Sequence, residues 1–366
     1  MADSFGKLLV TGGAGFIGTN FVRSWAERHP SDEIVVLDSL TYAANRDNLA
    51  GLARVRLVEG DIRDTGLVGV LLSGGIRTLV HFAAETHVDR SILDPDGFVD
   101  ANLVGTHSLL KAAKAAWLDT GDGLGHRFHH ISTDEVYGSV GEDEPAFAET
   151  APYAPNSPYS ATKAGSDHLV RAYHRTYGLQ TTVTNCSNNF GPYQFPDKLI
   201  PLFLINCLEG RPLPLYGDGM HVRDWLHVED HVRGIELVLL NGRSGETYNI
   251  GSGTGLSNGV VAELICGAVD EAFESDPSLA RRFPRAPVAR GEPSATLLAR
   301  VSDRPGHDRR YAVDAGKIER ELGYRPVRSF DQALASTIRW YIDNEQWWRR
   351  AVAGPGDSDP GRGLPP

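Results

Sequence analysis

The chain has 366 residues, of which 41% are hydrophobic and 23% charged, and its formal net charge is −11 at pH 7. This composition is typical of a globular protein with a large core, and the acidic balance argues against a nucleic-acid-binding surface, which needs clustered Lys and Arg. The sequence has no run of 18 apolar residues, no signal-like N-terminus and no His tract, and its cysteines (Cys186, Cys207 and Cys266) are widely spaced. We therefore expect a cytoplasmic protein with reduced thiols, without a metal site, and without membrane or nucleic-acid partners.

Short β-branched runs alternate with amphipathic helical patterns in the first half of the chain. Strands are predicted at residues 7–10, 34–37, 55–58, 78–82 and 128–132, and helices at residues 15–28, 102–117 and 159–177. Continuously apolar strands that alternate with helices indicate a parallel sheet covered on both faces. The predicted fold class is α/β, with a Rossmann-like doubly wound parallel sheet formed mainly by residues 1–187.

The second half is less regular and is predicted to form a smaller C-terminal α/β substrate-binding domain, mainly over residues 188–348. Helices are expected at 195–210 and 228–241, and a strand at 247–251 that returns to the first sheet, so that residues 222–252 rejoin the first domain. Residues 275–300, rich in Arg, Pro and Ala, are expected to form an exposed insertion, and residues 354–366 a disordered tail.

A glycine-rich loop follows the first predicted strand. Gly13, Gly15 and Gly18 fit the pattern G-x-G-x-x-G, and the second predicted strand ends at Asp38, 20 residues after Gly18. Such a loop lets a pyrophosphate approach the backbone at a helix N-terminus, and the acid can bind both ribose hydroxyls while repelling a 2′-phosphate. The loop and the acid together predict NAD rather than NADP. The third strand leads into Asp61, where the adenine is expected, although Asp61 alone could equally cap a loop.

A phenol and an ammonium lie four residues apart in the helical pattern, at Tyr159 and Lys163, so they share one helix face. For Tyr159 to act as a base near neutrality its pKa must fall by about three units, which corresponds to about 4 kcal/mol of phenolate stabilisation. Lys163 and a positively charged nicotinamide could supply this together. With Thr133 at a strand end, the arrangement resembles the extended short-chain dehydrogenase/reductase family, in which a Thr or Ser, a Tyr and a Lys remove a hydroxyl proton while hydride passes to NAD⁺.

Two adjacent acids, Asp134 and Glu135, follow the strand at residues 128–132. Elimination of water needs one group that takes a carbon-bound proton and another that protonates the leaving hydroxyl, and neighbouring carboxyls can be held in different protonation states. The alternative is that Asp134 caps the following turn while Glu135 points to solvent. The residues alone leave both interpretations open.

Longer motifs are similar to those of the dTDP-glucose 4,6-dehydratases. The segment Thr-Asp-Glu-Val-Tyr-Gly at 133–138 is the signature of that family, and the resemblance extends over residues 6 to 348 with further motifs at 81–91, 186–199, 223–226 and 303–311. Three positions depart from the family pattern: Thr86 replaces a usual Ser, Asp100 a common Thr close to the cofactor, and Phe190 a usual Tyr.

The resemblance implies a lyase that oxidises C4 of dTDP-glucose transiently with bound NAD, eliminates water across C5–C6, and returns the hydride to C6. It makes Asp134 the acid, Glu135 the base and Tyr159 the redox base, assisted by Thr133 and Lys163. Implied cofactor contacts are Gly12, Gly15, Phe16, Ile17, Gly18, Asp38, Ser39, Leu40, Thr41, Asp61, Ile62, Phe82, Ala83, Ala84, Thr86, Asp100, Tyr159, Lys163 and Asn189. Implied substrate contacts are Thr86, Thr133, Asn188, Lys198, Leu199, Pro214, Leu215, Tyr216, Arg223, Asn258, Arg304 and His307.

The sequence is also compatible with other functions. A nucleotide-sugar epimerase or decarboxylase would share the redox residues but lack the paired acids, and a non-catalytic NAD-sensing protein would typically lose the Tyr–Lys pair. Sequence spacing does not separate thymidine from uridine recognition. The apolar faces of the helices at 102–117 and 159–177 could form the helix-bundle homodimer typical of the family, or could face the sheet.

Overall fold

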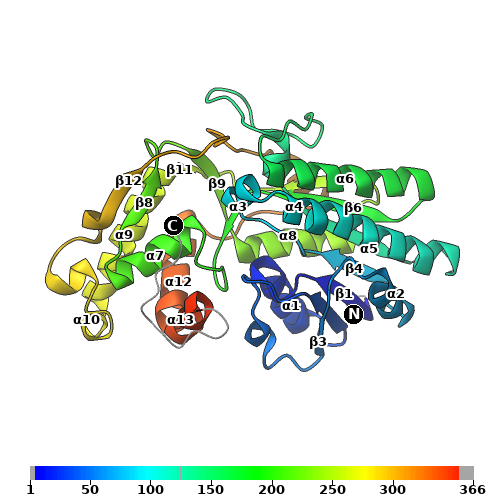
Figure 1. The fold of residues 1–366 in the computed structure, drawn as a ribbon, viewed down its shortest axis with the longest axis horizontal. Helices are drawn as coiled ribbons and strands as arrows, with labels where there is room; N and C mark the ends of the chain where they lie inside the picture. Colours follow the sequence, from blue (N-terminus) through cyan, green and yellow to red (C-terminus); the bar gives the residue numbers. More distant parts are fainter. Residues whose placement is uncertain (1–4, 122, 124, 354–366) are drawn as a thin grey trace.

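The computed structural model describes residues 5–121, 123 and 125–353, so the predicted tail at 354–366 lies outside the described residues. The central element is a sheet of seven parallel strands in the order β10-β6-β5-β4-β1-β2-β3 (Figure 1). The strands are β1 (Lys7–Thr11), β2 (Glu33–Asp38), β3 (Val55–Glu59), β4 (Thr78–His81), β5 (Arg127–Thr133), β6 (Thr181–Cys186) and β10 (Thr247–Ile250). The predicted Rossmann-like fold is confirmed, including the late return of β10 beside β6.

Helices cover both faces of this sheet because its strands are apolar on both sides. Leu8 and Val10 of β1 pack into one cluster with Trp25, whereas Leu9 between them packs with Val68 in another. The first face is covered by α1 (Phe16–Arg28), α8 (Val228–Asn241) and α11 (Gly316–Leu322), and the second by α2 (Thr65–Ser73), α5 (Gly105–Lys114) and α6 (Pro158–Tyr177).

Two parts of the first half differ from the prediction. The helix expected at 102–117 is α5 flanked by π-helical segments at Val99–Val104 and Ala115–Asp119. Helix α2 and strand β6 were not predicted. Short helices α3 (Val88–Leu93) and α4 (Asp96–Phe98) connect β4 to this helical run.

A second group of elements lies beside the sheet, on the left of Figure 1. Its core combines apolar residues of long helices with those of two small sheets, β11-β9-β7 and β12-β8. Its strands are β7 (Asn188–Phe190), β8 (Leu213–Tyr216), β9 (Val222–His227), β11 (Gly255–Ser257) and β12 (Leu298–Val301). Its helices are α7 (Leu199–Glu209), α9 (Asn258–Ser275), α10 (Leu279–Arg282), α12 (Phe330–Asp343) and α13 (Glu345–Ala353).

The prediction that residues 275–300 form an exposed insertion is wrong. Phe283 is only 1% exposed and packs in the second core, and Ala286 is also buried there. Ser294 is buried too, and its hydroxyl donates to Asp270 of α9 at 2.5 Å. Strand β12 then pairs with β8. The segment was predicted to be exposed because it is rich in Arg, Pro and Ala, although a few buried residues anchor it to the second core.

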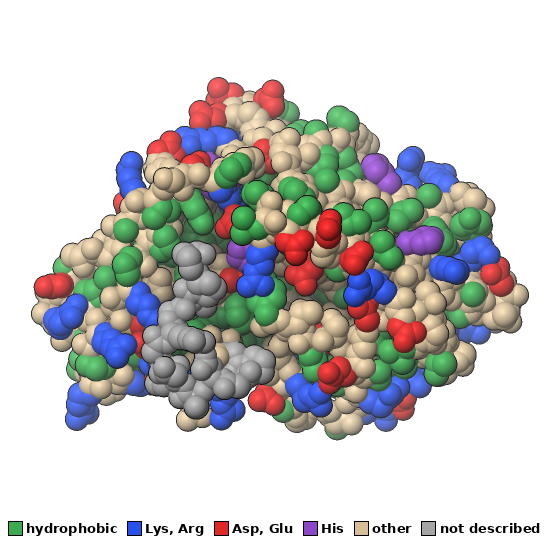
Figure 2. All heavy atoms as spheres, in the orientation of Figure 1, with side chains coloured by type: hydrophobic (Ala, Val, Ile, Leu, Met, Phe, Trp, Pro, Cys, Tyr) green, Lys and Arg blue, Asp and Glu red, His purple; other side chains and the backbone are tan. Residues whose placement is uncertain are grey.

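Figure 2 shows that the face seen in Figure 1 is hollowed between the two groups of elements, with acidic, basic and His side chains at the hollow. Over the part of the chain that the structure describes, no helix is long and apolar enough to cross a membrane.

Candidate active site

The glycine loop between β1 and α1 is shaped partly by the chain itself. Gly12 has φ +70°, and a Cβ there would lie 2.6 Å from the backbone nitrogen of Ala83, at the end of β4. A Cβ on Gly18 would lie 2.2 Å from the carbonyl oxygen of Gly12, so neither position can carry a side chain. Gly15 is different, since a Cβ there would meet only the Gly12 oxygen, at 3.4 Å. The space beside Gly15 suits a ligand that approaches the backbone closely.

The start of α1 offers donors to that space. Gly15 is the N-cap residue and provides no side-chain cap, so the first turn of the helix keeps backbone N–H groups for an anion. Asp38, at the end of β2, accepts hydrogen bonds from the N–H groups of Ala14 and Leu40, both at 2.9 Å. It thereby ties the neighbouring strand to the glycine loop, and its carboxylate has further lone pairs for ribose hydroxyls.

Asp61, expected beside the adenine, and Asp100, expected close to the cofactor, already share a partner. Arg63 binds Asp61 at 2.7 Å and Asp100 at 2.9 Å, and all three side chains are partly exposed. Arg63 holds the pKa of Asp61 below its usual value. Asp61 therefore orients Arg63 at the rim of the site, while Ile62 beside it is buried.

Helix α6 places the redox pair. Ser157 caps the helix and exchanges hydrogen bonds with Ser160 in a capping box, and Pro158 occupies the first helical position. Tyr159 and Lys163 are both buried, and the Lys163 ammonium donates to the carbonyl oxygen of Ile131 on β5 at 2.7 Å. Burial lowers the pKa of Lys163 to about 8.

The surroundings of Tyr159 do not lower its pKa, as the role of a base would require. Burial, and then the charge of Glu135, raise the pKa of Tyr159 well above its usual value, and a hydrogen bond with Thr133 opposes the rise. The described residues alone therefore do not lower the phenol pKa as a base requires. A further positive charge is needed, which a bound nicotinamide would supply.

The two acids stand at the end of β5 in different surroundings. Thr133, not Asp134, caps the turn, because its hydroxyl accepts the N–H of Glu135 at 3.2 Å. Asp134 is 3% exposed, and its Oδ2 has no hydrogen-bond partner among the described residues. The interpretation of Asp134 as a turn cap is thus wrong, since its side chain is buried and its second oxygen is unsatisfied.

The surrounding charges affect the pKa values of the two carboxyls differently. Burial, and then the neighbouring Glu135 and Asp224, raise the pKa of Asp134 well above its usual value, which favours the protonated form. Burial also raises the pKa of Glu135, but Arg223, Arg304 and Lys198 oppose that rise. Asp134 is suited to give a proton and Glu135 to take one.

The same three cations converge on this site from separate elements. Lys198 precedes α7 and donates to the carbonyl of Thr86 at 3.1 Å. Arg223 of β9 is buried and donates to the carbonyl of Asp308 at 2.9 Å, and Arg304 binds Asp89 at 2.9 Å. Three cations close to an acid pair are a suitable environment for a diphosphate.

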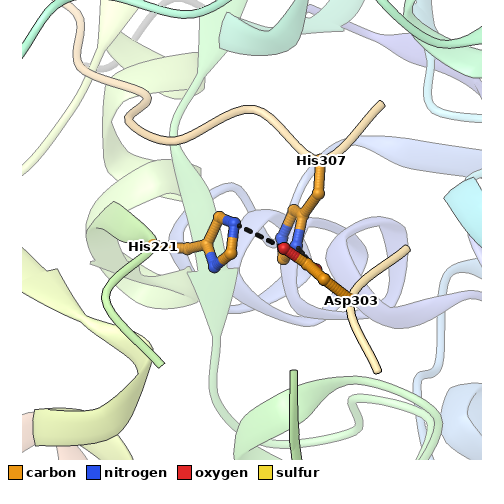
Figure 3. A group of neighbouring side chains, drawn as sticks. All are labelled: His221, Asp303 and His307. Atoms are coloured by element: carbon orange, nitrogen blue, oxygen red, sulfur yellow. Dashed lines mark hydrogen bonds and ion pairs between the residues drawn. The ribbon is translucent and has the colours of Figure 1, made fainter. Parts of the chain in front are cut away.

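His307 belongs to a cluster with His221 and Asp303, and of the three only His307 was predicted as a site residue (Figure 3). Its Nδ1 lies 2.7 Å from Asp303, and His221 lies 3.3 Å from the other oxygen of the same carboxylate. The two imidazole rings are stacked with centroids 3.6 Å apart and planes 12° apart. Lone pairs in nearly parallel planes do not converge on one ion, so the group holds His307 in place rather than forming a metal centre. His221 lies two residues before Arg223, a spacing that puts both on one face of a strand and could have revealed it.

Other residues predicted to bind substrate lie around this hollow. The side-chain oxygens of Asn188 and Asn258 are buried without a hydrogen-bond partner among the described residues, as expected of groups that a ligand satisfies. Tyr216 of β8 donates to Asp89 at 3.5 Å, beside Arg304. Asn189 is already engaged, because its oxygen lies 3.0 Å from His231.

The glycine loop, the acid after β2 and the buried Tyr–Lys pair on α6 define an enzyme site of the extended short-chain dehydrogenase/reductase class. The family model described as GDP-mannose 4,6 dehydratase matches residues 9–337, and the chain belongs to this family.

Relatives within this class are similar over nearly the whole chain. The dTDP-glucose 4,6-dehydratase of Neisseria meningitidis serogroup B is 51% identical over 354 residues, which cover 95% of this chain and 96% of the relative. The crystal structure of DesIV, a dTDP-glucose 4,6-dehydratase from Streptomyces venezuelae with NAD and TYD bound, is 51% identical with a TM-score of 0.82, covering 93% of this chain and 98% of that one. The dTDP-glucose 4,6-dehydratase of Bacillus anthracis, in complex with NAD, is 40% identical with a TM-score of 0.80, covering 94% and 99%.

Proposed function

We propose that this chain is a dTDP-glucose 4,6-dehydratase, which converts dTDP-glucose into dTDP-4-keto-6-deoxyglucose with bound NAD that is regenerated in each turnover. The observation that carries the proposal is the pair of acids Asp134 and Glu135, which stand in different surroundings next to the buried Tyr159: Asp134 has a buried oxygen without a partner among the described residues, whereas Glu135 is near three cations. Oxidation or epimerisation at C4 needs Tyr159 but has no use for this pair. The names of the relatives support the same reaction.

The residues present fit NAD. Gly15 leaves space at the N-terminus of α1 for a pyrophosphate, and Asp38 can accept hydrogen bonds from both ribose hydroxyls. Lys163 would bind the second ribose. When bound, NAD⁺ supplies a hydride acceptor for C4 and then the hydride donor for C6.

The chain's own residues move the protons. Tyr159 takes the proton of the sugar 4-hydroxyl, with Thr133 hydrogen-bonded to the phenol oxygen. The resulting 4-ketone acidifies the proton on C5, which Glu135 removes. Asp134 protonates the 6-hydroxyl, so the C6–O bond breaks and water leaves. A proton returned to C5 completes the 4-keto-6-deoxy product.

The nucleotide half of the substrate is held by the second group of elements. Lys198, Arg223 and Arg304 bind the diphosphate, and Tyr216 stacks on the base. Asn188 and Asn258 satisfy their buried oxygens on hydroxyl or N–H donors of the ligand. We assign the base as thymine because the relatives act on dTDP-glucose, and the ring contact between His307 and Tyr216 supports a role of His307 in binding the nucleotide.

The proposal includes a homodimer in the cytoplasm. Ala161, Gly165, Leu169 and Ala172 form a small and apolar stripe along α6, with at least part of each residue exposed, and Val104 beside α5 is 43% exposed. The other face of each helix packs on the sheet, so the exposed stripe is available to a second copy. The three cysteines are free and buried, as suits a reducing compartment.

Mass spectrometry of the product tests the reaction class. Incubation of the purified protein with dTDP-glucose is expected to give a product lighter by one water, with no net NADH. A product of unchanged mass would indicate a 4-epimerase instead. Accumulation of one NADH per sugar consumed would indicate a simple dehydrogenase and would contradict the proposal.

A further inference from the structure

A buried carboxylate that the proposed mechanism does not use lies beneath the redox pair. Asp167 is on α6, four residues after Lys163 and eight after Tyr159, so all three share one face of the helix. Asp167 is 4% exposed, as is Lys163. A charged group buried this deeply needs partners, because desolvation strongly disfavours its ionised form.

The structure holds Asp167 in one position. Its Oδ2 accepts hydrogen bonds from the Ser132 hydroxyl at 2.8 Å and from the Tyr153 hydroxyl at 2.9 Å. Nε2 of His130 lies 3.2 Å from its Oδ1. His130 and Ser132 flank Ile131 on β5, whose carbonyl accepts the hydrogen bond from Lys163. One short stretch of β5 therefore fixes both the carboxylate and the ammonium.

The charges around Lys163 single out Asp167. The other titratable groups that interact electrostatically with Lys163 are His81 on β4, His130 on β5 and Cys186 on β6, and Tyr159 lies on the same face of α6. Burial holds the pKa of both imidazoles well below their usual value and raises those of the phenol and the thiol, so all four groups are neutral near pH 7. Asp167 is thus the anion that compensates the buried ammonium.

We propose that Asp167 is a positioning residue for Lys163. The ionised carboxylate of Asp167 keeps the buried ammonium of Lys163 charged and directed at the redox site. The inference rests on the proposed function for the use of that ammonium, which is to bind the cofactor ribose and favour the Tyr159 phenolate. The placement of the two charges does not depend on which sugar reacts.

The test is a direct titration of Lys163 by NMR. The chain has six lysines, so ¹³Cε-lysine labelling gives a simple spectrum, and Lys163→Arg assigns the signal. Asp167→Asn keeps an acceptor oxygen for Ser132 and Tyr153 but removes the charge. The matched control is Tyr153→Phe, which removes a hydrogen bond to the same carboxylate and leaves its charge.

Burial lowers the pKa of Lys163 to about 8, and its titration midpoint is expected to fall by about 1 pH unit or more in Asp167→Asn, and much less in Tyr153→Phe. In the native protein the Lys163 signal should show a second inflection near pH 6, where Asp167 titrates, since the pKa of Asp167 is raised to about 6. The titration of the native protein tests the inference even if the Asp167→Asn variant does not fold. An unchanged midpoint in a folded variant, or the absence of the second inflection, would overturn the inference.

Activity gives an independent result. In Asp167→Asn the alkaline limb of the kcat profile should move to lower pH by the same shift as the NMR midpoint, with KM for the sugar nucleotide nearly unchanged. If the NMR midpoint shifts and the native protein does not dehydrate dTDP-glucose, the inference on Asp167 holds and the proposed function fails. If dehydration is observed and neither the midpoint nor the limb moves, only the inference fails.

Discussion

At the scale of single residues, neighbours in the sequence acquire opposite tasks from their surroundings. Asp134 and Glu135 are adjacent at the end of β5, yet one oxygen of Asp134 is buried without a partner, while Glu135 faces the cations Lys198, Arg223 and Arg304. The acid and base roles follow from this asymmetry rather than from the residue types, because both side chains are carboxyls.

Glu135→Gln should separate the two halves of the reaction. The variant can still oxidise C4 but has no base for C5, so a reduced cofactor is expected to accumulate in single turnover, while product formation slows by about 100-fold or more. Stopped-flow absorbance of NADH together with product analysis measures both steps. Equal loss of oxidation and elimination would contradict the role of Glu135.

The same groups predict a pH dependence. Glu135 must be ionised to act as a base, so the elimination rate should fall as pH drops through its raised pKa. Asp134 must be protonated and Lys163 charged, so the rate should also fall as pH rises through the Lys163 midpoint at about 8. A profile of kcat against pH is expected to be bell-shaped. A rate that falls at neither low nor high pH would be inconsistent with these roles.

Alanine replacements distinguish a glycine that the fold requires from a glycine that leaves room for the cofactor. Gly18→Ala places a Cβ 2.2 Å from a backbone oxygen and is expected to destabilise the protein by about 1–3 kcal/mol. Gly15→Ala meets only one atom, at 3.4 Å, so it should leave the melting temperature of the cofactor-free protein nearly unchanged but reduce bound NAD. Thermal melts and extraction of the cofactor give both readouts. Full NAD retention by Gly15→Ala would remove the assignment of that space to the pyrophosphate.

Much of the site could be predicted at this scale because its residues fall in short motifs at strand ends. Gly15, Asp38 and the Tyr159–Lys163 pair are recognisable from spacing, since turns and helix faces impose fixed intervals. His221 and Asp167 were not recognised, although both lie at regular intervals from predicted residues, because their partners Asp303 and Ser132 are brought to them only by tertiary packing.

At the scale of elements, the prediction worked where the strands were apolar on both faces. Strands β1, β2 and β4 are inner strands of the sheet and were predicted nearly to their bounds. Strand β6 was missed because its Thr-rich sequence, Thr181–Cys186, reads as polar although every residue in it is buried. Its threonines are satisfied by partners such as His129 and need no solvent.

The prediction for residues 275–300 was wrong for the opposite reason. The charged surface residues of this segment suggested exposure, whereas Phe283 fills the second core. Phe283→Ala is therefore expected to lower the free energy of unfolding by about 3–5 kcal/mol, as measured by urea denaturation. Arg281→Ala, at an exposed neighbouring position, serves as the control and should change stability by less than about 0.5 kcal/mol. Similar small effects for both variants would show that the segment is not part of the core.

At the scale of the whole molecule, the two groups of elements are joined by contacts on both sides of the glycine loop. Trp347 of α13 donates to the side chain of Asn48 at 2.7 Å, and Asn48 in turn donates to the carbonyl of Ala14 at 3.1 Å. Tyr42 donates to Asp197 at 3.1 Å, one residue before Lys198. These contacts connect the nucleotide-binding elements directly to the cofactor loop.

Assembly can be tested at this scale with one substitution. Ala172→Glu puts a charge at the C-terminal end of the exposed stripe on α6 and is expected to convert a dimer into a monomer, as seen by light scattering or sedimentation. The control is Val70→Glu on α2, which is also exposed but lies outside the stripe. A native protein that is monomeric at micromolar concentration, or a dimer unaffected by Ala172→Glu, would contradict the proposed interface.

The most direct test of dehydration follows the hydrogen on C5. When the protein converts dTDP-glucose in deuterated water, removal of the C5 proton by Glu135 and its later replacement from solvent should leave deuterium at C5 of a 4-keto-6-deoxy product, and the hydride that reaches C6 should come from C4 of the same sugar. A product that keeps its original hydrogen at C5, or that retains its 6-hydroxyl, would contradict the account.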